Sequence, residues 1–265
     1  MTINNSYKAG CIKSIINFCE AKGCFLNYGL KNVSTYQWPK KGPSVDALLK
    51  NYDEKYQLKG QSNYEKNVEL KLLLSEEFKS KNLDVRKISE WIIKSWGGIP
   101  KLSKNIDEYI KKVSEKEYPN MLSGVASYSK LFAMFYPREF AIYDARVAVS
   151  LNVIQLLSDE CEVLFFPYLS GRNKITGYQK TKKGFSRLPE FNRANISKTS
   201  GKSWGYLDAA EVYPEYNNIL TSICFQKNWN LWDIEMLLFS KAEDLVMQIR
   251  KDKNYSSVNW SPICP

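Results

Sequence analysis

The sequence contains no histidine among its 265 residues. This absence excludes the mechanisms in which a histidine activates a serine or a cysteine, and it excludes the histidine-containing motifs of zinc proteases and histidine-ligated iron. If the protein is an enzyme, its chemistry depends on the residue types that remain, which are Asp, Glu, Lys, Tyr and Cys.

The six cysteines include no Cys-x-x-Cys pair. The spacing therefore excludes a zinc ribbon and the usual iron–sulfur motifs, and we expect the cysteines to be buried thiols. We predict no metal and no cofactor.

Long hydrophobic runs are also lacking, since no segment approaches the roughly 18 to 20 apolar residues that a membrane span requires. The first twenty residues are too polar for a secretory signal. We expect a cytoplasmic monomer that does not enter the membrane.

What the chain has is positive charge: 38 Lys and Arg against 28 Asp and Glu give a net charge of +10. This excess favours a polyanionic partner, with nucleic acid ahead of an anionic membrane surface, although a basic protein that is simply soluble fits as well. Hydrophobic residues make up 44% of the chain, which is enough to form a sizeable core.

Apolar residues recur at helical spacing along much of the chain, so the predicted fold class is mostly α. A punctuated segment with Pro39, Gly42 and Pro43 lies near the start. We therefore expect residues 1–60 to form an N-terminal extension packed on a helical domain of residues 61–265. The segment 162–168 is either a strand or a buried apolar run. The predicted helices span about 12–20, 63–79, 85–96, 106–116, 127–135, 144–157, 215–224 and 231–251.

Residues 169–203 differ in character, because glycines alternate with Lys and Arg. A structureless loop of this length is unusual inside a compact domain, which favours a function or hidden strands. We expect a basic insertion that follows a phosphate backbone or shapes a pocket, with a solvated loop as the alternative.

The most informative segment is 122–157, where a turn at Leu122-Ser123-Gly124-Val125 separates two helices. Glycine tolerates the left-handed dihedrals of a tight helical hairpin, and the helix N-terminus after it presents free N–H groups that bind phosphate. An ordinary corner in an all-α protein gives the same pattern.

The segment resembles the helix-hairpin-helix DNA glycosylases, whose hairpin reads Leu-Pro-Gly-Val-Gly. Leu122, Gly124 and Val125 match, while Ser123 and Ala126 replace the proline and the second glycine. The run Tyr-Asp-Ala-Arg-Val at 143–147 resembles the segment with the catalytic aspartate, particularly in the 8-oxoguanine DNA glycosylase-like branch. The resemblance covers residues 85–158, and the C-terminal helices more loosely, and it implies a helix-hairpin-helix glycosylase-like fold.

The resemblance implies hydrolysis of the bond between a base and its deoxyribose, on a nucleotide flipped out of double-stranded DNA. Asp144 would stabilise the oxocarbenium character that develops on the sugar. Its alternative role, a helix N-cap, is compatible with catalysis.

In bifunctional members of the family a lysine after the hairpin forms a Schiff base. Alignment on the hairpin places Tyr128 at that position and Lys130 two residues later. Burial and the helix N-terminus would favour the free amine of Lys130. If Lys130 only contacts phosphate or solvent, the enzyme is monofunctional and uses water activated by Asp144.

Further residues follow from the resemblance and the charge pattern. The expected DNA contacts are Gly124, Ala126, Ser127, Arg146, Lys174, Lys182 and Lys183. The aromatic candidates for a base pocket are Tyr128, Tyr143, Phe166 and Trp204. Glu235 and Asp244, on the last helix, are interpreted as structural.

The leading hypothesis is thus a DNA glycosylase that removes either an oxidised purine, in base excision repair, or a hypermodified phage base, in antiviral defence. One alternative is a non-catalytic DNA-binding module that uses the hairpin and the basic insertion to hold phosphates. The other is an all-α interaction protein whose positive charge is incidental.

Overall fold

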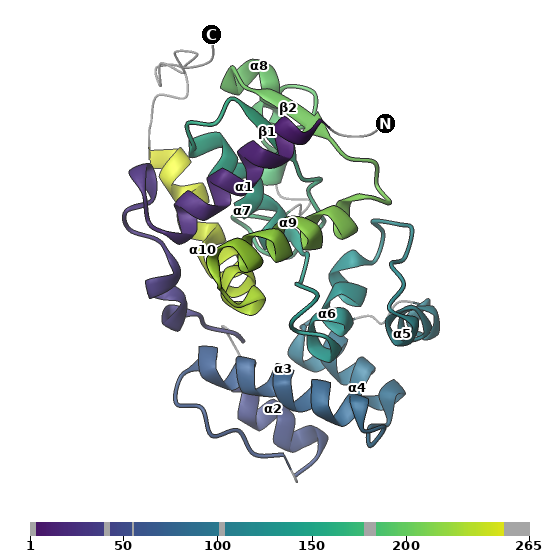
Figure 1. Ribbon diagram of the computed structural model, residues 1–265. Helices are drawn as coiled ribbons and strands as arrows, with labels where there is room; N and C mark the ends of the chain where they lie inside the picture. The colour runs from purple at the N-terminus through teal and green to yellow at the C-terminus, as the bar shows by residue number, and fades with distance from the viewer. Residues whose placement is uncertain (1–3, 40–42, 55, 101–103, 178–183, 252–265) are drawn as a thin grey trace.

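The computed structural model describes residues 4–39, 43–54, 56–100, 104–177 and 184–251, and this part of the chain is mostly helical (Figure 1). The α-helices are α1 Asn5–Cys19, α2 Val45–Tyr52, α3 Asn63–Lys79, α4 Val85–Trp91, α5 Ile106–Glu115, α6 Val125–Phe135, α7 Ala145–Leu157, α8 Ile196–Ser200, α9 Val212–Lys227 and α10 Leu231–Lys251. The 3-10 helices are η1 Gly23–Phe25, η2 Leu30–Thr35, η4 Phe185–Arg187 and η5 Pro189–Phe191, and a π-helical turn, η3, spans Ile92–Trp96. No helix in these ranges is long and apolar enough to cross a membrane.

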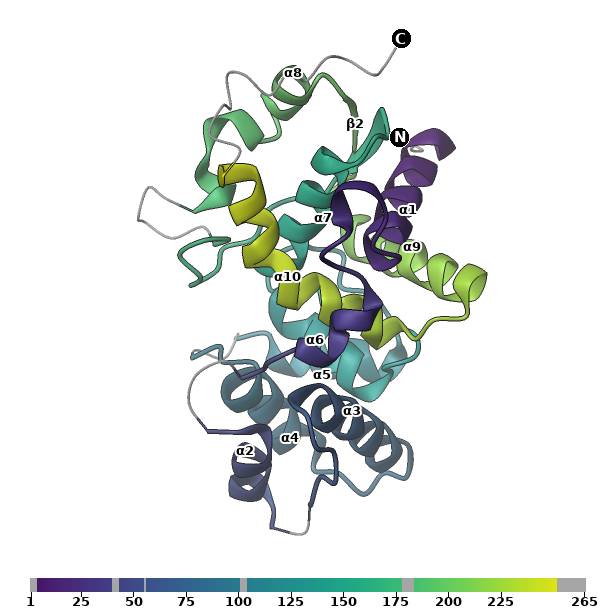
Figure 2. The same ribbon diagram turned by 90° about the vertical axis from the view of Figure 1, so that its left-hand side faces the viewer.

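The helices divide into two halves. Figures 1 and 2 show α2, α3, α4, α5 and α6 gathered in one half, and α1, α7, α8, α9, α10 and both strands in the other. In the first half α3 packs on α6, and in the second α7 packs along α10. The segment with α6 and α7 connects the halves, so the candidate residues on these two helices lie where the halves meet.

The N-terminal helix α1 begins earlier than predicted, at Asn5 rather than near residue 12. The side chain of Asn4 accepts a hydrogen bond from the backbone N–H of Ser6 (3.2 Å) and so caps the helix. Helix α1 packs on β1, α7 and α9, whereas α2 packs on α3 in the other half. The boundary near residue 60 stays a prediction.

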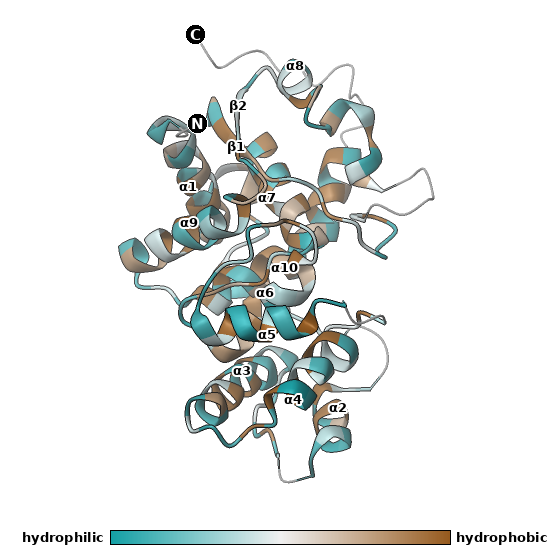
Figure 3. Ribbon diagram, turned by 90° about the vertical axis from the view of Figure 1, so that its right-hand side faces the viewer, coloured by the Kyte–Doolittle hydropathy of each residue, from teal (hydrophilic) through white to brown (hydrophobic). Residues whose placement is uncertain are grey.

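The strongly periodic segments form the predicted helices. Helix α3 begins with a capping box between Ser62 and Glu65, and it buries Leu70 and Leu74. In Figure 3 the ribbon of α5 is mostly hydrophilic. Its buried residues, Ile106, Tyr109 and Val113, are three and four apart and form the single inward face that the sequence predicts.

The β-prone segment forms strand β1, Glu162–Phe165, which pairs in parallel with β2, Ser203–Tyr206. The expected insertion therefore lies between two paired strands, and it contains η4, η5 and α8. Inside it the rings of Phe185 and Phe191 stack with centroids 4.8 Å apart. The alternative of a solvated loop is therefore wrong for the part of the insertion that the structure describes.

The expectation of buried thiols is confirmed for two cysteines and wrong for a third. Cys11 and Cys19 are buried free thiols. Cys24 is exposed, because it lies in the short helix η1 on the surface.

Candidate functional site

The turn between α5 and α6 requires a glycine at position 124. Gly124 has a left-handed conformation with φ of 80° and serves as the N-cap of α6. The hydroxyl of Tyr109, on α5, occupies the space that a Cβ atom would need. The N–H of Val125 donates to the carbonyl of Leu122 (3.2 Å) and closes the turn. The predicted hairpin is therefore present as a tight helix–turn–helix corner.

Gly124→Ala is expected to lower the free energy of unfolding by about 1–3 kcal/mol through backbone strain, and by more if Tyr109 cannot move aside. Urea denaturation measures the change. Gly23→Ala is a matched control, because Gly23 also has a positive φ (55°) but has no atom within 4 Å of the added Cβ. Equal losses in the two variants would show that the contact with Tyr109 does not restrict this turn.

Lys130 lies on α6, and its side chain is buried, with 5% of the residue exposed. Its Nζ donates to the carbonyl oxygen of Ala126 (2.6 Å). The π-helical turn η3 leads directly into Gly97, and a Cβ at Gly97 would lie 2.8 Å from Cδ of Lys130. π-helical turns are often found at functional sites. Here the turn and its glycine make room for the lysine.

Asp144 is the N-cap of α7, as its position in the sequence predicts. Its Oδ1 accepts hydrogen bonds from the N–H groups of Arg146 (2.9 Å) and Val147 (3.1 Å). Its Oδ2 accepts no hydrogen bond from any described residue, and the side chain is half-buried. One carboxylate oxygen thus fixes the helix, and the other remains available to a ligand.

The structure brings Lys130 and Asp144 together with a third charged residue, Glu235 on α10. Burial lowers the pKa of Lys130, while the negative charges of Asp144 and Glu235 act in the opposite direction. A buried amine of this kind is more readily deprotonated than an ordinary surface lysine.

Glu235 forms an ion pair with Lys71, on α3, that the sequence did not reveal. Both side chains are almost completely buried, with 2% of Lys71 and 4% of Glu235 exposed. Burial raises the pKa of Glu235 above its usual range, although Lys71 pulls it down. The phenol of Tyr36 is buried nearby, and burial together with Glu235 and Asp144 raises its pKa. Since Lys71 and Glu235 are 164 residues apart, no local pattern could have paired them.

Arg146 is turned toward the protein. Its Nη2 donates to Glu243 on α10, its guanidinium lies 4.9 Å from the ring centroid of Phe239, and its side chain is 12% exposed. Asn173, from the insertion, also donates to Glu243 (2.8 Å). The guanidinium holds α7 against α10, and its Nη1 is buried without a hydrogen-bond partner among the described residues. The expected phosphate contact stays a prediction.

The four aromatic residues expected to line a base pocket lie in the core instead. Each is at most 5% exposed. The hydroxyl of Tyr128 donates to Met121 (2.7 Å), that of Tyr143 donates to Pro167 (2.9 Å), and the indole of Trp204 donates to Ser200 (3.0 Å). The ring of Phe166 packs near that of Tyr143. Large aromatic rings on the inner faces of the fold fill space between its elements.

The insertion reaches the candidate site through its first residues. A Cβ at Gly171 would lie 2.7 Å from the Cβ of Ala145, the first residue of α7, and Arg172 donates to the carbonyl of Gly98. Lys174 is exposed, as a phosphate contact requires. Lys182 and Lys183 lie outside the described residues. The described part of the insertion thus packs against the first residue of α7, next to Asp144.

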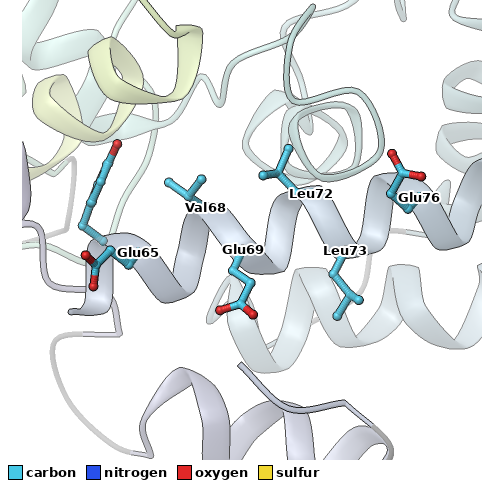
Figure 4. Close-up of a pocket in the computed structure, with 7 residues that line it drawn as sticks. Glu65, Val68, Glu69, Leu72, Leu73 and Glu76 are labelled. Atoms are coloured by element: carbon cyan, nitrogen blue, oxygen red, sulfur yellow. The ribbon is translucent and has the colours of Figure 1, made fainter. Parts of the chain in front are cut away.

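A hollow lies elsewhere, along α3 (Figure 4). Its volume is about 440 Å³. The lining residues are Tyr64, Glu65, Val68, Glu69, Leu72, Leu73 and Glu76. Glu65 and Glu69 are committed to backbone N–H groups at the start of the helix. Neither Lys130 nor Asp144 lines this hollow, so it has no chemistry in common with the candidate site.

Within the described ranges no three residues of the His, Cys, Asp and Glu types are placed to hold a metal ion. No protein-family model, no curated protein and no solved structure matches this chain.

Proposed function

We propose that this protein is a DNA glycosylase of the helix-hairpin-helix type, which releases a modified base from double-stranded DNA. The main support is that a half-buried aspartate, at the start of α7, lies near a buried lysine on the helix that follows a tight glycine turn. The net charge of +10 supports a polyanionic substrate.

The two side chains suit the two needs of the reaction. As the bond between base and sugar breaks, its electrons leave with the base and positive charge develops at C1′. The free Oδ2 of Asp144 stabilises that charge. The amine of Lys130 forms a new bond to C1′, loses a proton, and yields a Schiff base once the sugar ring opens. Its surroundings favour this role, because burial shifts the lysine toward the free amine.

The turn supplies a site for a phosphate group. Helix α6 begins directly after Gly124, and no described group accepts the N–H of Ala126. Free N–H groups at a helix N-terminus bind anions. We propose that Gly124 and Ala126 hold the DNA backbone there, with Lys174 as a contact from the insertion. Ser127, also expected as a DNA contact, is buried, and its N–H donates to the carbonyl of Gly124 (2.8 Å). The base itself is an oxidised purine or a hypermodified phage base, which assigns the protein to base excision repair or to antiviral defence.

The direct test is incubation with duplexes that contain candidate bases, including modified phage DNA, followed by alkali. A glycosylase leaves abasic sites, so strand breaks are expected on at least one substrate. Tight, salt-sensitive binding without breaks on any substrate would contradict catalysis and favour the non-catalytic DNA-binding alternative.

Borohydride reduction is expected to trap a covalent complex with substrate DNA that Lys130→Ala abolishes, since the alanine variant has no amine at this position. Electrophoresis of the reduced mixture measures it. Lys202→Arg is the control, because Lys202 is also a buried lysine, and burial lowers its pKa to about 8. Trapping that persists in Lys130→Ala would show that another amine is the nucleophile. Base release without any trapping in the wild type would leave water activated by Asp144.

One observation favours the non-catalytic alternative. The four expected pocket aromatics are core residues, and the hollow along α3 includes neither Lys130 nor Asp144. A glycosylase must therefore make room for the flipped base by moving side chains near Asp144.

A further inference from the structure

The hollow along α3 is lined by residues of that helix alone, so no residue of another described element covers it. The opposite side of α3 faces the core. Leu70 and Leu74 are buried there, and the hydroxyl of Ser75 donates to the carbonyl of Phe135 on α6 (2.9 Å). Helix α3 thus has one side packed in the protein and another side that keeps apolar residues without a packed neighbour.

Three apolar residues and three glutamates line the hollow, and we refer to them as the α3 face. They are Val68, Leu72, Leu73, Glu65, Glu69 and Glu76. Figure 4 shows Val68 and Leu72 on one side of the face and Leu73 on the other. The repeat of the helix places the glutamates between them. The face therefore has a row of carboxylates with apolar side chains on both sides.

The carboxylates of the α3 face are held in place and charged. Oε2 of Glu65 and Oε2 of Glu69 each accept two backbone N–H groups of the segment 59–62, at 2.7–2.9 Å. These bonds lower the pKa of Glu65. The Oε1 atoms of both accept no hydrogen bond from a described residue, and Glu76 has only a loose ion pair with Lys79 (3.9 Å). The face is thus negative in a chain whose net charge is +10.

The charge of the α3 face restricts what can cover it. DNA is repelled, since its phosphates would meet three carboxylates. A second copy that used the same face would bring two sets of glutamates together, which costs free energy. The apolar side chains still require an apolar partner. We propose that the α3 face binds a partner protein through an amphipathic helix that carries Lys or Arg among its apolar residues.

The dimensions of the face suit such a helix. From Glu65 to Glu76 it is about 17 Å long, which corresponds to about three helical turns. Apolar residues of the partner pack beside Leu72 and Leu73, and its cations reach the Oε1 atoms of the glutamates. Glu65 and Glu69 are already held by the backbone, so they lose little freedom on binding. A basic partner is repelled by the net charge of the chain as a whole and attracted to this face.

The test uses the full chain, labelled with carbon-13 at the methyl groups of Leu and Val, and two synthetic peptides of about 14 residues. One peptide has Leu and Lys at amphipathic helical spacing, and the other has Glu in place of every Lys. The Leu/Lys peptide is expected to shift the NMR signals of Val68, Leu72 and Leu73. The Leu/Glu peptide is expected to leave them unchanged, because its carboxylates repel those of the face. Binding only elsewhere on the chain, or equal shifts with both peptides, overturns the proposal.

Charge reversal tests the role of the carboxylates. Glu76→Lys is expected to weaken binding of the Leu/Lys peptide by about threefold or more at low salt, and high salt is expected to reduce the difference. Glu108→Lys makes the same change at another exposed glutamate, on α5, and is expected to leave the affinity unchanged. Both side chains are exposed, so both variants are expected to fold. Fluorescence anisotropy measures the affinities, and equal values for the two variants count against the proposal.

The same NMR signals test the other occupants. Without a peptide, the signals of the α3 face are expected to stay in place as the protein is concentrated and as duplex DNA is added. Shifts with protein concentration would show that a second copy covers the face, and shifts with DNA would show that DNA does. Either result overturns the proposal. No step of this test requires base release, so the proposed function and this inference can fail separately.

Discussion

Asp144→Asn is expected to lower the rate of base release by about 10²- to 10³-fold, while the protein stays folded. Asparagine places an oxygen where Oδ1 now accepts the N–H groups of Arg146 and Val147, and it is as good an N-cap as aspartate. What it lacks is the negative charge that stabilises the sugar cation. The loss is therefore expected in the chemical step rather than in stability or DNA binding. Single-turnover strand-break assays, with excess protein and alkaline treatment, measure it.

A matched control exists on another helix. Asp84 is the N-cap of α4 and accepts the N–H of Lys87 (3.0 Å), so Asp84→Asn makes the same chemical change at the same kind of helix start. It is expected to leave base release unchanged. A full rate in Asp144→Asn, or equal losses in both variants, would exclude a catalytic role for the Asp144 carboxylate.

Lys71→Met is expected to lower the free energy of unfolding by about 3–5 kcal/mol. The change leaves the carboxylate of Glu235 buried without its counter-ion, and an unpaired buried charge is among the costliest defects in a protein interior. Urea or thermal denaturation, followed by circular dichroism, measures the loss.

The loss should depend on pH in a defined direction. Burial raises the pKa of Glu235 above the ordinary 4.5 in the folded protein, and removing Lys71 raises it further. The folded variant then binds a proton that the unfolded chain releases, so its stability falls as pH rises through that window. The deficit relative to the wild type is expected to be larger at about pH 8 than at about pH 5.

The double variant Lys71→Met/Glu235→Leu is the control for this interpretation. It replaces the ion pair by apolar side chains, which is often neutral or stabilising. Most of the lost stability is expected to return. A double variant no more stable than Lys71→Met would show that the lysine contributes through packing and not through its charge.

The helical part of the fold could be predicted where the apolar spacing is regular. The segments 63–79 and 231–251 form α3 and α10 with the predicted bounds. The π-helical turn at 92–96 was predicted as ordinary helix, because side-chain spacing does not distinguish hydrogen bonds to the fifth residue from those to the fourth. Strand β2 was hidden for a different reason, since its partner β1 precedes it by about forty residues and parallel pairing leaves no local signal.

The site was predictable only in part. The position of Asp144 before an apolar helix indicates an N-cap from sequence alone, and the structure has it there. Lys71 and Glu235 each lie on a helix with many charged residues, so nothing local marks them as buried. The aromatic candidates were predicted to line a pocket but are buried in the core. A sequence shows that a ring is present and not which way it faces.

The packing of α1 has a consequence for how the chain can fold as it is synthesised. Helix α1 precedes most of the elements that it packs on along the chain, because its contacts include β1, α7 and α9, and α9 ends only at Lys227. Helices α2 to α6 contact one another and can assemble as soon as α6 has emerged. The apolar face of α1, with Ile15 and Phe18 at its centre, stays unburied until β1, α7 and α9 have been made. Apolar surface that is exposed in this way during synthesis promotes aggregation.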